Sequence, residues 1–324
     1  MPEIELRPLG TTGIRVSPVA LGCWPISGMT SLDVHEADSL ATLQAALDCG
    51  VNFWDTAYAY GRAGESERLI ARALEGRRDE VVIATKGGIA WDAAGSRVID
   101  GRPAVLRQQC EESLRRLNTD RVELLYLHAP DPKTPLADSA GELRRLMEEG
   151  KTRAVGVSNF SVAQLAEFHA VCPIAAVQPP YNMLQREIER DLLPWCRERS
   201  IAVNVYWPLL KGLLAGKLPR DFVFQPGDGR AKYPQFAGQE WQRNQDFVDE
   251  LRQIADEAGR TVAQLVINWT IHQPGITTAL CGAKRPQQIQ ETAGAMGWKL
   301  TPEQFARIDA ALLRRGTPVT KSAV

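Results

Sequence analysis

The chain has 324 residues, of which 44% are hydrophobic, and its formal net charge is −1. This length accommodates one large domain, 1–324, since a single α/β barrel takes about 250 residues, although two domains would also fit. The near-neutral, scattered charge argues against a nucleic acid or an anionic membrane surface as a partner.

The N-terminal residues and the cysteines favour a reduced, cytoplasmic protein. The first residues carry mixed charges and lack the apolar core of a signal peptide. No segment approaches the roughly 20 apolar residues of a membrane span. The six cysteines include no C-x-x-C pair, and the four histidines show no spacing such as H-E-x-x-H. We therefore expect free thiols, no metal site and a cytoplasmic location.

Two kinds of segment alternate along the chain. Nearly continuous apolar runs are typical of strands buried on both faces, and they lie at 16–21, 51–54, 81–85, 122–127, 154–157, 174–177, 201–205 and 277–280. Amphipathic stretches follow them and predict helices at 34–48, 65–74, 103–117, 136–149, 162–170, 188–199, 262–272 and 286–295. Asp33 and Ser161 are expected N-caps, and Pro103 suits a first helical turn.

This alternation predicts parallel strands joined by right-handed crossovers. Eight strands and eight helices favour a closed (β/α)8 TIM barrel over an open sheet. The alternative is a doubly wound sheet, but no G-x-G-x-x-G follows any of the runs.

Four segments are additional to the eight strands and eight helices of a minimal barrel. Residues 5–15 predict a β-hairpin that closes one end of the barrel. Residues 209–239 have no clear period, and loops of this length are usually functional or disordered. Residues 240–258 and 302–313 predict two additional helices.

Active sites of such barrels lie at the C-terminal ends of the strands. The residues that follow the runs are Gly22, Cys23, Trp24, Asp55, Lys86, His128, Ser158, Asn159, Gln178 and Tyr206, with Gly282 to Arg285 after the last run. Taken alone, Asp55 fits a helix cap and His128 fits a packing histidine. Together with Lys86 and a nearby tyrosine they form a set able to transfer a proton.

The segment 51–61, Val-Asn-Phe-Trp-Asp-Thr-Ala-Tyr-Ala-Tyr-Gly, resembles the signature of the aldo-keto reductase family. Further matches follow in family order at 84–86, 127–131, 156–160, 178–182, 206–209 and 212–217, and the resemblance covers about residues 6–310. It implies a barrel that reduces an aldehyde or ketone with hydride from NADPH, or catalyses the reverse reaction.

The resemblance also implies roles for four residues. Tyr60 would donate the proton, and Lys86 would lower the tyrosine pKa from its usual value of about 10. Asp55 would hold Lys86 charged and oriented, and His128 would donate to, or relay protons for, the substrate oxygen. Tyr58 competes with Tyr60, but the Tyr-Gly pair and the five-residue offset from Asp55 favour Tyr60.

The family holds its cofactor at the barrel mouth. By resemblance, Ser158, Asn159 and Gln178 would bind the nicotinamide carboxamide, and Tyr206 would stack on the ring. The other expected cofactor contacts are Gly22, Cys23, Trp24, Asp55, Trp207, Pro208, Leu209, Lys211, Gly212, Leu213, Leu214, Lys217, Gly282, Ala283, Lys284, Gln288, Glu291 and Thr292.

Lys284 and Arg285 favour NADP(H), because two cations suit a 2′-phosphate. Gln288 stands where the family often has arginine, and Thr292 where it often has asparagine. These departures leave use of NAD(H) open.

Trp24, Trp54, Tyr58 and Trp91 are the expected walls of the substrate pocket, together with the 209–239 loop. Trp54 equally fits a helix interface. This lining favours an uncharged or aromatic carbonyl substrate. Two other functions compete with a working oxidoreductase: a nicotinamide-binding regulatory or sensor subunit with the same fold, and a barrel that acts on phosphorylated substrates without nicotinamide. The oligomeric state is open.

Overall fold

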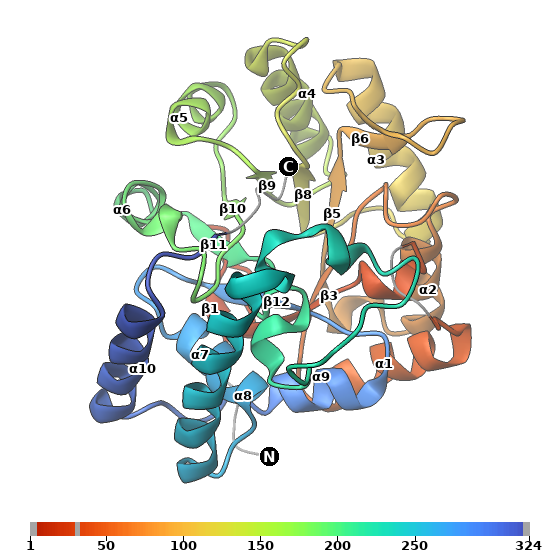
Figure 1. The fold of residues 1–324 in the computed structure, drawn as a ribbon. Helices are drawn as coiled ribbons and strands as arrows, with labels where there is room; N and C mark the ends of the chain where they lie inside the picture. The colour runs from red at the N-terminus through yellow and green to blue at the C-terminus, as the bar shows by residue number, and fades with distance from the viewer. Residues whose placement is uncertain (1–4, 30–32, 320–324) are drawn as a thin grey trace.

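The computed structural model describes residues 5–29 and 33–319. Its centre is a closed barrel of parallel strands in the order β10-β11-β12-β3-β4-β5-β8-β9 (Figure 1). The strands are β3 (Val19–Gly22), β4 (Phe53–Asp55), β5 (Val82–Gly87), β8 (Leu124–Leu127), β9 (Val155–Ser158), β10 (Ala176–Gln178), β11 (Ala202–Val205) and β12 (Thr278–Gly282). Each overlaps one of the predicted runs, so the predicted (β/α)8 barrel is confirmed.

Helices surround the barrel. Those that follow the strands are α1 (Glu36–Asp48), α2 (Glu65–Ala73), α3 (Pro103–Leu117), α4 (Leu136–Glu148), α5 (Val162–Val171), α6 (Leu192–Glu198), α8 (Val262–Ile271) and α9 (Pro286–Ala293). The two additional helices are also present, as α7 (Gly238–Glu257) and α10 (Pro302–Arg315). Ser161 caps α5 in a capping box with Gln164, as expected for this residue pattern.

Two helix starts differ from the prediction. Asp33 is not the N-cap of α1, because it has a left-handed φ of 52° and the helix begins only after the extended residue His35. The sixth helix begins at Leu192 rather than 188, since Glu187–Glu189 forms a separate 3-10 helix, η3, and Asp191 accepts a hydrogen bond from the amide of Leu192.

The predicted N-terminal hairpin closes one end of the barrel. Strands β1 (Arg7–Pro8) and β2 (Arg15–Val16) pair antiparallel. Leu9, Ile14 and Val16 are buried with the side chains that fill the barrel interior. The hairpin therefore covers the end of the barrel at which the strands begin. The end at which the strands finish is left open for a site.

A second hairpin was not predicted. It follows β5 and consists of β6 (Ile89–Trp91) and β7 (Arg97–Ile99). Its turn is held by Asp92, which accepts from the amide of Ser96 at 2.8 Å, and by Gly95 at a φ of 77°. Three-residue strands are too short to show a reliable alternation in the sequence.

The 209–239 segment is structured rather than disordered. It contains η4 (Leu210–Ala215), η5 (Gly229–Lys232) and η6 (Pro234–Phe236), and it crosses in front of the strands in Figure 1. Phe224 packs against Phe222 and Phe236, with ring centroids 5.0 and 5.3 Å apart. This aromatic cluster gives the segment its own small core.

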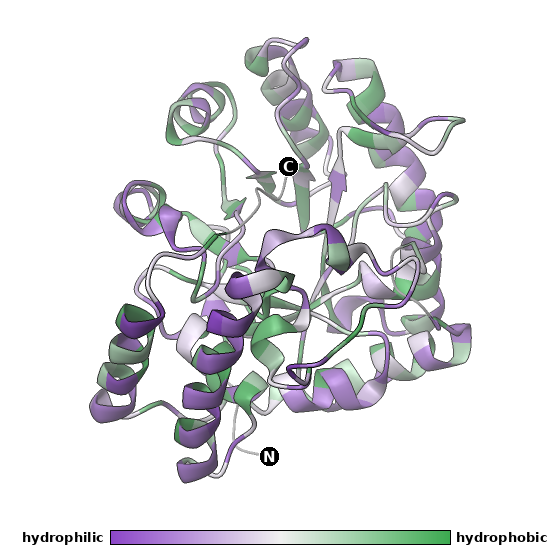
Figure 2. Ribbon diagram, in the orientation of Figure 1, coloured by the Kyte–Doolittle hydropathy of each residue, from purple (hydrophilic) through white to green (hydrophobic). Residues whose placement is uncertain are grey.

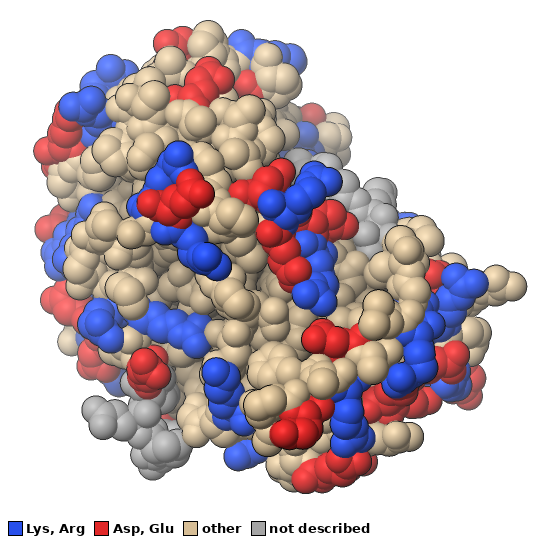
Figure 3. Space-filling view, turned by 90° about the vertical axis from the view of Figure 1, so that its left-hand side faces the viewer, with Lys and Arg blue, Asp and Glu red and all other residues tan. Residues whose placement is uncertain are grey.

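The core has two layers. One lies inside the barrel and the larger one lies between the strands and the helices, where α8 is almost wholly buried. Figure 2 shows the corresponding contrast between the hydrophilic α7 on the outside and the hydrophobic α8 beneath it. On the face shown in Figure 3, acidic and basic side chains are interspersed, with no large area of one sign. Within 5–29 and 33–319, no helix is both long and apolar enough to cross a membrane.

Candidate active site

One structural rule brings the predicted strand-end residues together. Side chains alternate along a strand, so a residue two positions beyond an interior side chain also points inward. Phe53, Ala84, Tyr126, Ala154 and Ala176 line the barrel interior. Counting two or four residues further along each of these strands leads to five predicted site residues, whose side chains therefore also point inward. They are Asp55, Lys86, His128, Ser158 and Gln178.

The site has a buried floor and a half-exposed rim. Asp55, Lys86, Ser158 and Gln178 form the floor, each at most 3% exposed. The rim comprises Trp24, Tyr60, His128, Asn159, Tyr206 and Trp207, which are half-buried. Reactive groups on the rim can thus meet a ligand, while the floor is shielded from water.

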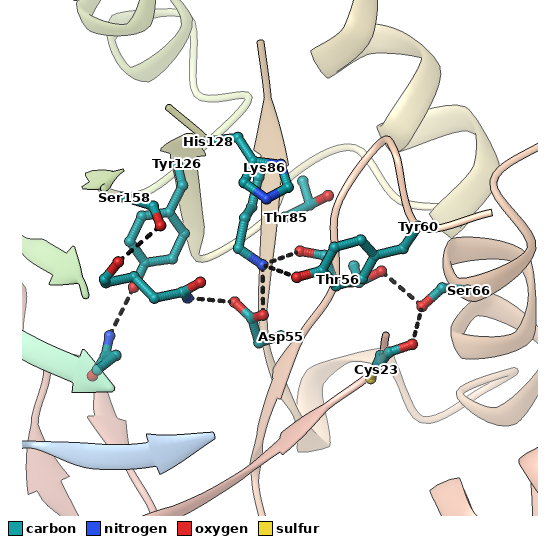
Figure 4. Close-up of polar contacts among 12 residues, drawn as sticks. Cys23, Asp55, Thr56, Tyr60, Ser66, Thr85, Lys86, Tyr126, His128 and Ser158 are labelled. Atoms are coloured by element: carbon teal, nitrogen blue, oxygen red, sulfur yellow. Dashed lines mark hydrogen bonds and ion pairs between the residues drawn. The ribbon is translucent and has the colours of Figure 1, made fainter. Parts of the chain in front are cut away.

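Lys86 is the centre of the floor (Figure 4). Its Nζ donates to Asp55 Oδ1 at 2.5 Å, to the carbonyl of Thr56 at 2.8 Å and to the Tyr60 hydroxyl at 3.1 Å. An ammonium has three donors, and these contacts use all of them. This geometry brings together three of the four predicted catalytic residues.

The pKa values of this group set its proton positions. Burial alone would lower the pKa of Lys86, but Asp55 and Tyr60 outweigh it and the pKa is raised, so the amine stays an ammonium. Burial raises the pKa of the Asp55 carboxyl, and its contacts with Lys86 and Gln178 oppose that rise.

For Tyr60 the net direction corrects the expectation from the sequence. Lys86 does lower the tyrosine pKa, yet burial raises it by more, so the pKa of Tyr60 is above its ordinary value. The phenol therefore holds its proton at neutral pH, ready to be donated.

His128 lies beside Tyr60, with ring centroids 6.0 Å apart. Burial, then the positive charges of Lys86 and Arg97, hold its pKa well below the ordinary value, so the imidazole is neutral. Its Nδ1 atom is buried and has no hydrogen-bond partner among the described residues. A buried polar atom of this kind is normally paired, so a bound molecule could supply the missing partner.

The residues predicted to bind a carboxamide form one hydrogen-bonded chain. Gln178 Nε2 donates to Asp55 Oδ2 at 2.8 Å, and Ser158 Oγ donates to the Gln178 carbonyl at 2.8 Å. Asn159 Nδ2 donates to Ser158 Oγ at 3.0 Å, and Asn159 Oδ1 accepts from the Tyr206 hydroxyl at 2.7 Å. Asn159 has a φ of 65°, a conformation that asparagine tolerates better than most residues.

Further along the mouth, Lys211 and Gly212 make a tight turn, with φ values of 57° and 91°. The ammonium of Lys211 lies over the rings of Trp207 and Tyr233, 4.0 and 4.7 Å from their centroids. Burial, then the charge of Lys232, lower the pKa of Lys211 to about 8. An anion bound here would raise the pKa of this lysine again.

Near α9, several residues that were predicted to contact the cofactor bind one another. Lys217 forms an ion pair with Glu291. The side-chain oxygen of Gln288 accepts from the amides of Lys284 and Arg285, at 2.8 and 3.1 Å, and so caps α9. These amides lead into a helix N-terminus, which is where a phosphate would seek donors.

The structure contradicts two predictions for the pocket wall, and it buries the side chains of two predicted cofactor contacts. Trp54 follows the interior residue Phe53, so it points outward into the layer beneath the helices and does not line a pocket. Tyr58 faces α3, where its hydroxyl donates to Glu112 at 2.7 Å. The side chain of Cys23 is fully buried, which leaves only its backbone for a ligand. Thr292 is buried, and its hydroxyl donates to the carbonyl of Gln288 at 3.1 Å.

Trp91 lies on the unpredicted hairpin, and its indole donates to the carbonyl of Ala59 at 2.8 Å. This hydrogen bond anchors the hairpin to the loop that carries Tyr60. Trp91 is half-buried and remains a candidate wall of the pocket.

Sequence reasoning missed two supports of the site. Glu67 is fully buried on α2 and accepts from Thr85 Oγ1 at 2.7 Å, while Ser66 bonds Thr56 at 2.8 Å. Both lie in a charged stretch at the start of a helix, which resembles a solvent-exposed face. No local signal distinguishes them, because their burial depends on the neighbouring strands.

Comparison with known proteins agrees with this geometry. A model of the aldo/keto reductase family matches residues 18–313. The chain belongs to the aldo/keto reductase family. Members of this family are oxidoreductases that generally use nicotinamide cofactors, usually NADPH.

Two relatives match over nearly their whole length. The chain is 36% identical over 312 residues to aldo-keto reductase YhdN of Bacillus subtilis (strain 168), covering 95% of this chain and 94% of that protein. It is 32% identical over 316 residues to probable aldo-keto reductase 1 of Glycine max, covering 96% and 90%.

Two solved structures are also similar to this chain. A glycerol dehydrogenase of Gluconobacter oxydans superposes with a TM-score of 0.89 at 36% identity, covering 99% of this chain and 98% of that chain. The holo form of an aldo-keto reductase of Bacillus halodurans has a TM-score of 0.78 at 24% identity, with the same coverage, and supports the fold alone.

Proposed function

We propose that this aldo-keto reductase interconverts an aldehyde or ketone and its alcohol with NADP(H), and that Tyr60 is the general acid. One observation carries the proposal: the Lys86 ammonium contacts both Asp55 and the hydroxyl of Tyr60 at the barrel mouth. A half-exposed phenol with a buried ammonium behind it can release a proton and keep the resulting charge stabilised.

The residues at the mouth fit a nicotinamide cofactor. Ser158, Asn159 and Gln178 would hold the carboxamide, since their side chains offer donors and acceptors beside one another. The orphaned Nδ1 of His128 is a polar atom that a ligand group could satisfy. When bound, the reduced nicotinamide supplies the hydride.

The chain's own residues handle the proton. As negative charge develops on the substrate oxygen, Tyr60 gives it the phenolic proton, and the phenolate is held by Lys86. Asp55 keeps Lys86 protonated and in place. His128 is neutral and can donate one N–H to the same oxygen, which orients the carbonyl for transfer. In the reverse direction, the Tyr60 phenolate accepts the proton of the alcohol.

Replacing Tyr60 by phenylalanine tests the assignment of the acid. The wild-type chain is expected to oxidise NADPH with 4-nitrobenzaldehyde, followed by the absorbance of the reduced cofactor. Tyr60→Phe is expected to reduce kcat by about 100-fold or more, while leaving the dissociation constant of NADPH unchanged. Tyr58→Phe is the matched control, because Tyr58 is directed to Glu112.

Other results would assign the acid to another residue or indicate another function. Retained activity in Tyr60→Phe with loss in Tyr58→Phe would reassign the acid. Tight NADPH binding without turnover across a broad carbonyl panel would indicate a regulatory subunit. Absence of NADPH binding would indicate a barrel that acts without nicotinamide.

The likeness to a glycerol dehydrogenase adds the oxidative direction to the proposal. The panel should therefore include glycerol with NADP⁺, measured as the appearance of NADPH. Turnover of small polyols and failure with aromatic aldehydes would narrow the substrate to a hydrophilic alcohol.

A further inference from the structure

The unpredicted hairpin presents an arginine on the side that faces the site. In the β6–β7 ladder Arg97 pairs with Trp91, and Ile99 pairs with Ile89. Paired residues of an antiparallel ladder share one face, as do residues two apart. Arg97 is therefore on the same face as Trp91, while Val98 is on the other, where it is 41% exposed.

Contacts of its neighbours show where this face points. Ile89 is buried with Ala59 and Ala129, and Trp91 and Ile99 pack against them. Ala59 directly precedes Tyr60, and Ala129 directly follows His128. The face that carries Arg97 is thus turned toward the two residues proposed to handle the proton.

The charge of Arg97 acts on both sides of the mouth. The pKa of His128, which follows β8, is lowered first by burial, then by the charge of Lys86 and then by the charge of Arg97. Burial raises the pKa of Tyr206, which follows β11, and Arg97 opposes that rise. An influence on residues at the ends of two separated strands agrees with the position that the ladder gives Arg97, on the hairpin face turned toward the mouth.

Among the residues that the structure describes, no carboxylate pairs with Arg97. It forms no ion pair or hydrogen bond with another of the residues in 5–29 and 33–319, and its side chain is exposed. Arg102, which lies just beyond the same hairpin, differs: its guanidinium is held by Asp100 at 2.6 Å. An unpaired guanidinium beside an apolar wall is suited to a ligand's carboxylate, which it can bind with two parallel hydrogen bonds.

We propose that Arg97 is the anion-binding residue of the substrate pocket, and that the chain prefers carbonyl compounds that carry a carboxylate or a similarly charged group. Trp91, its cross-strand partner, would cover the apolar part of the same molecule. The inference rests on the proposed reductase activity and names the substrate class for it. It reverses the expectation from the sequence, which favoured an uncharged substrate from the aromatic residues alone.

A pair of nearly isosteric aldehydes tests the proposal. The kcat/KM values of 2-, 3- and 4-formylbenzoate are compared with those of the corresponding formylbenzamides, with NADPH as the reductant. In the wild type at least one acid is expected to exceed its amide. Arg97→Gln is expected to lower kcat/KM for that acid by about 10- to 100-fold, mainly through KM, and to leave the amide unchanged. Arg97→Lys should restore part of the loss.

Arg62→Gln is the matched control. Arg62 is also exposed and unpaired within the described residues, and its guanidinium lies against Gly95 at the tip of the same hairpin. Its charge is not among those that shift His128 or Tyr206. This variant should keep the wild-type ratio of acid to amide.

Three results would overturn the proposal. The first is that Arg97→Gln lowers kcat/KM equally for the acid and the amide, and the second is that it lowers kcat/KM for neither. The third is that Arg62→Gln lowers kcat/KM selectively for the acid. If the wild type turns over neither these aldehydes nor any other compound of the carbonyl and polyol panel, the proposed activity fails instead. A titration of intrinsic tryptophan fluorescence with the formylbenzoates then still decides whether Arg97 binds the anion.

Discussion

At the scale of single residues, the site depends on a balance between burial and one buried cation. Lys86 stabilises the Tyr60 phenolate, but burial is the stronger influence and raises the tyrosine pKa overall. The proton is consequently retained in the resting protein, and in the proposed reaction it is released only when a stronger base develops beside it. A tyrosine whose pKa was lowered to neutrality would be half-ionised before the substrate arrived.

Arg285 gives a prediction about cofactor preference. Its exposed side chain follows β12 at the start of α9, where a 2′-phosphate is expected, and Gln288 already accepts from its backbone amide. Arg285→Ala should weaken NADPH binding by about 10-fold, because one charge-assisted contact is lost, and should leave NADH binding unchanged. Dissociation constants for both cofactors, measured by fluorescence titration, check this.

The control for that prediction is Lys299→Ala, which removes an exposed cation after α9. It should alter neither constant. Equal dissociation constants of NADPH and NADH in the wild type would remove the argument from the 2′-phosphate altogether.

At the scale of elements, α2 fixes the loop that carries Tyr60. Glu67 joins it to β5 through Thr85 and to α3 through Arg116, whose Nη1 lies 3.2 Å from the carboxylate. The same Nη1 donates to the carbonyl of Tyr58 at 3.2 Å. The loop after β4 is thus held from behind, on the side away from the ligand.

Replacing Glu67 by glutamine should destabilise the fold. The variant keeps an acceptor for Thr85 but removes the more buried of the two carboxylates beside Arg116, with Glu112 still 3.6 Å away. Because breaking a buried ion pair completely costs about 3–5 kcal/mol, we expect a loss toward or below the lower end of that range. Urea unfolding measures the loss, and kcat should fall as the Tyr60 loop loosens. Glu65→Gln, at an exposed position of the same helix, should cost less than about 0.5 kcal/mol. Equal stability of the Glu67 variant and the wild type would refute this account.

The hairpin and the long segment place different groups at the mouth. The β6–β7 hairpin supplies Trp91 and Arg97, while the 209–239 segment supplies Lys211 and Tyr233. In the proposed function, elements outside the barrel thus select the ligand, whereas the strand ends carry out the chemistry. This division is common in barrels of this kind, because loops can vary without disturbing the core.

At the scale of the whole molecule, the barrel interior limits what the strands can contain. Tyr126 fills the centre, and its hydroxyl accepts from Asn204 Nδ2 at 2.8 Å. A Cβ on Gly156 would lie 2.5 Å from the Tyr126 ring and 2.8 Å from the carbonyl oxygen of Ala176. A glycine is therefore required on β9 at this level.

Gly156→Ala should destabilise the fold by about 1–3 kcal/mol, because overpacking forces the ring and the neighbouring strand apart. Gly141→Ala is a control of the opposite sign, since Gly141 lies within α4 with open space around its Cβ position. It should stabilise the fold by about 0.5–1 kcal/mol. Urea unfolding of both variants separates the two effects, and a Gly156→Ala protein as stable as the wild type would contradict the packing argument.

The sequence by itself determined the order of strands and helices, several helix ends and the strand-end residues Asp55, Lys86 and His128. These features are local: apolar runs, capping residues and alternation along a strand are encoded by neighbours in the chain. Tertiary structure alone decided that Trp54 points outward, that Tyr58 bonds Glu112, that Glu67 is buried and that Arg97 pairs with Trp91 across a hairpin. It also decided the direction of the Tyr60 pKa, because burial and the distance to Lys86 are set by segments far apart in sequence.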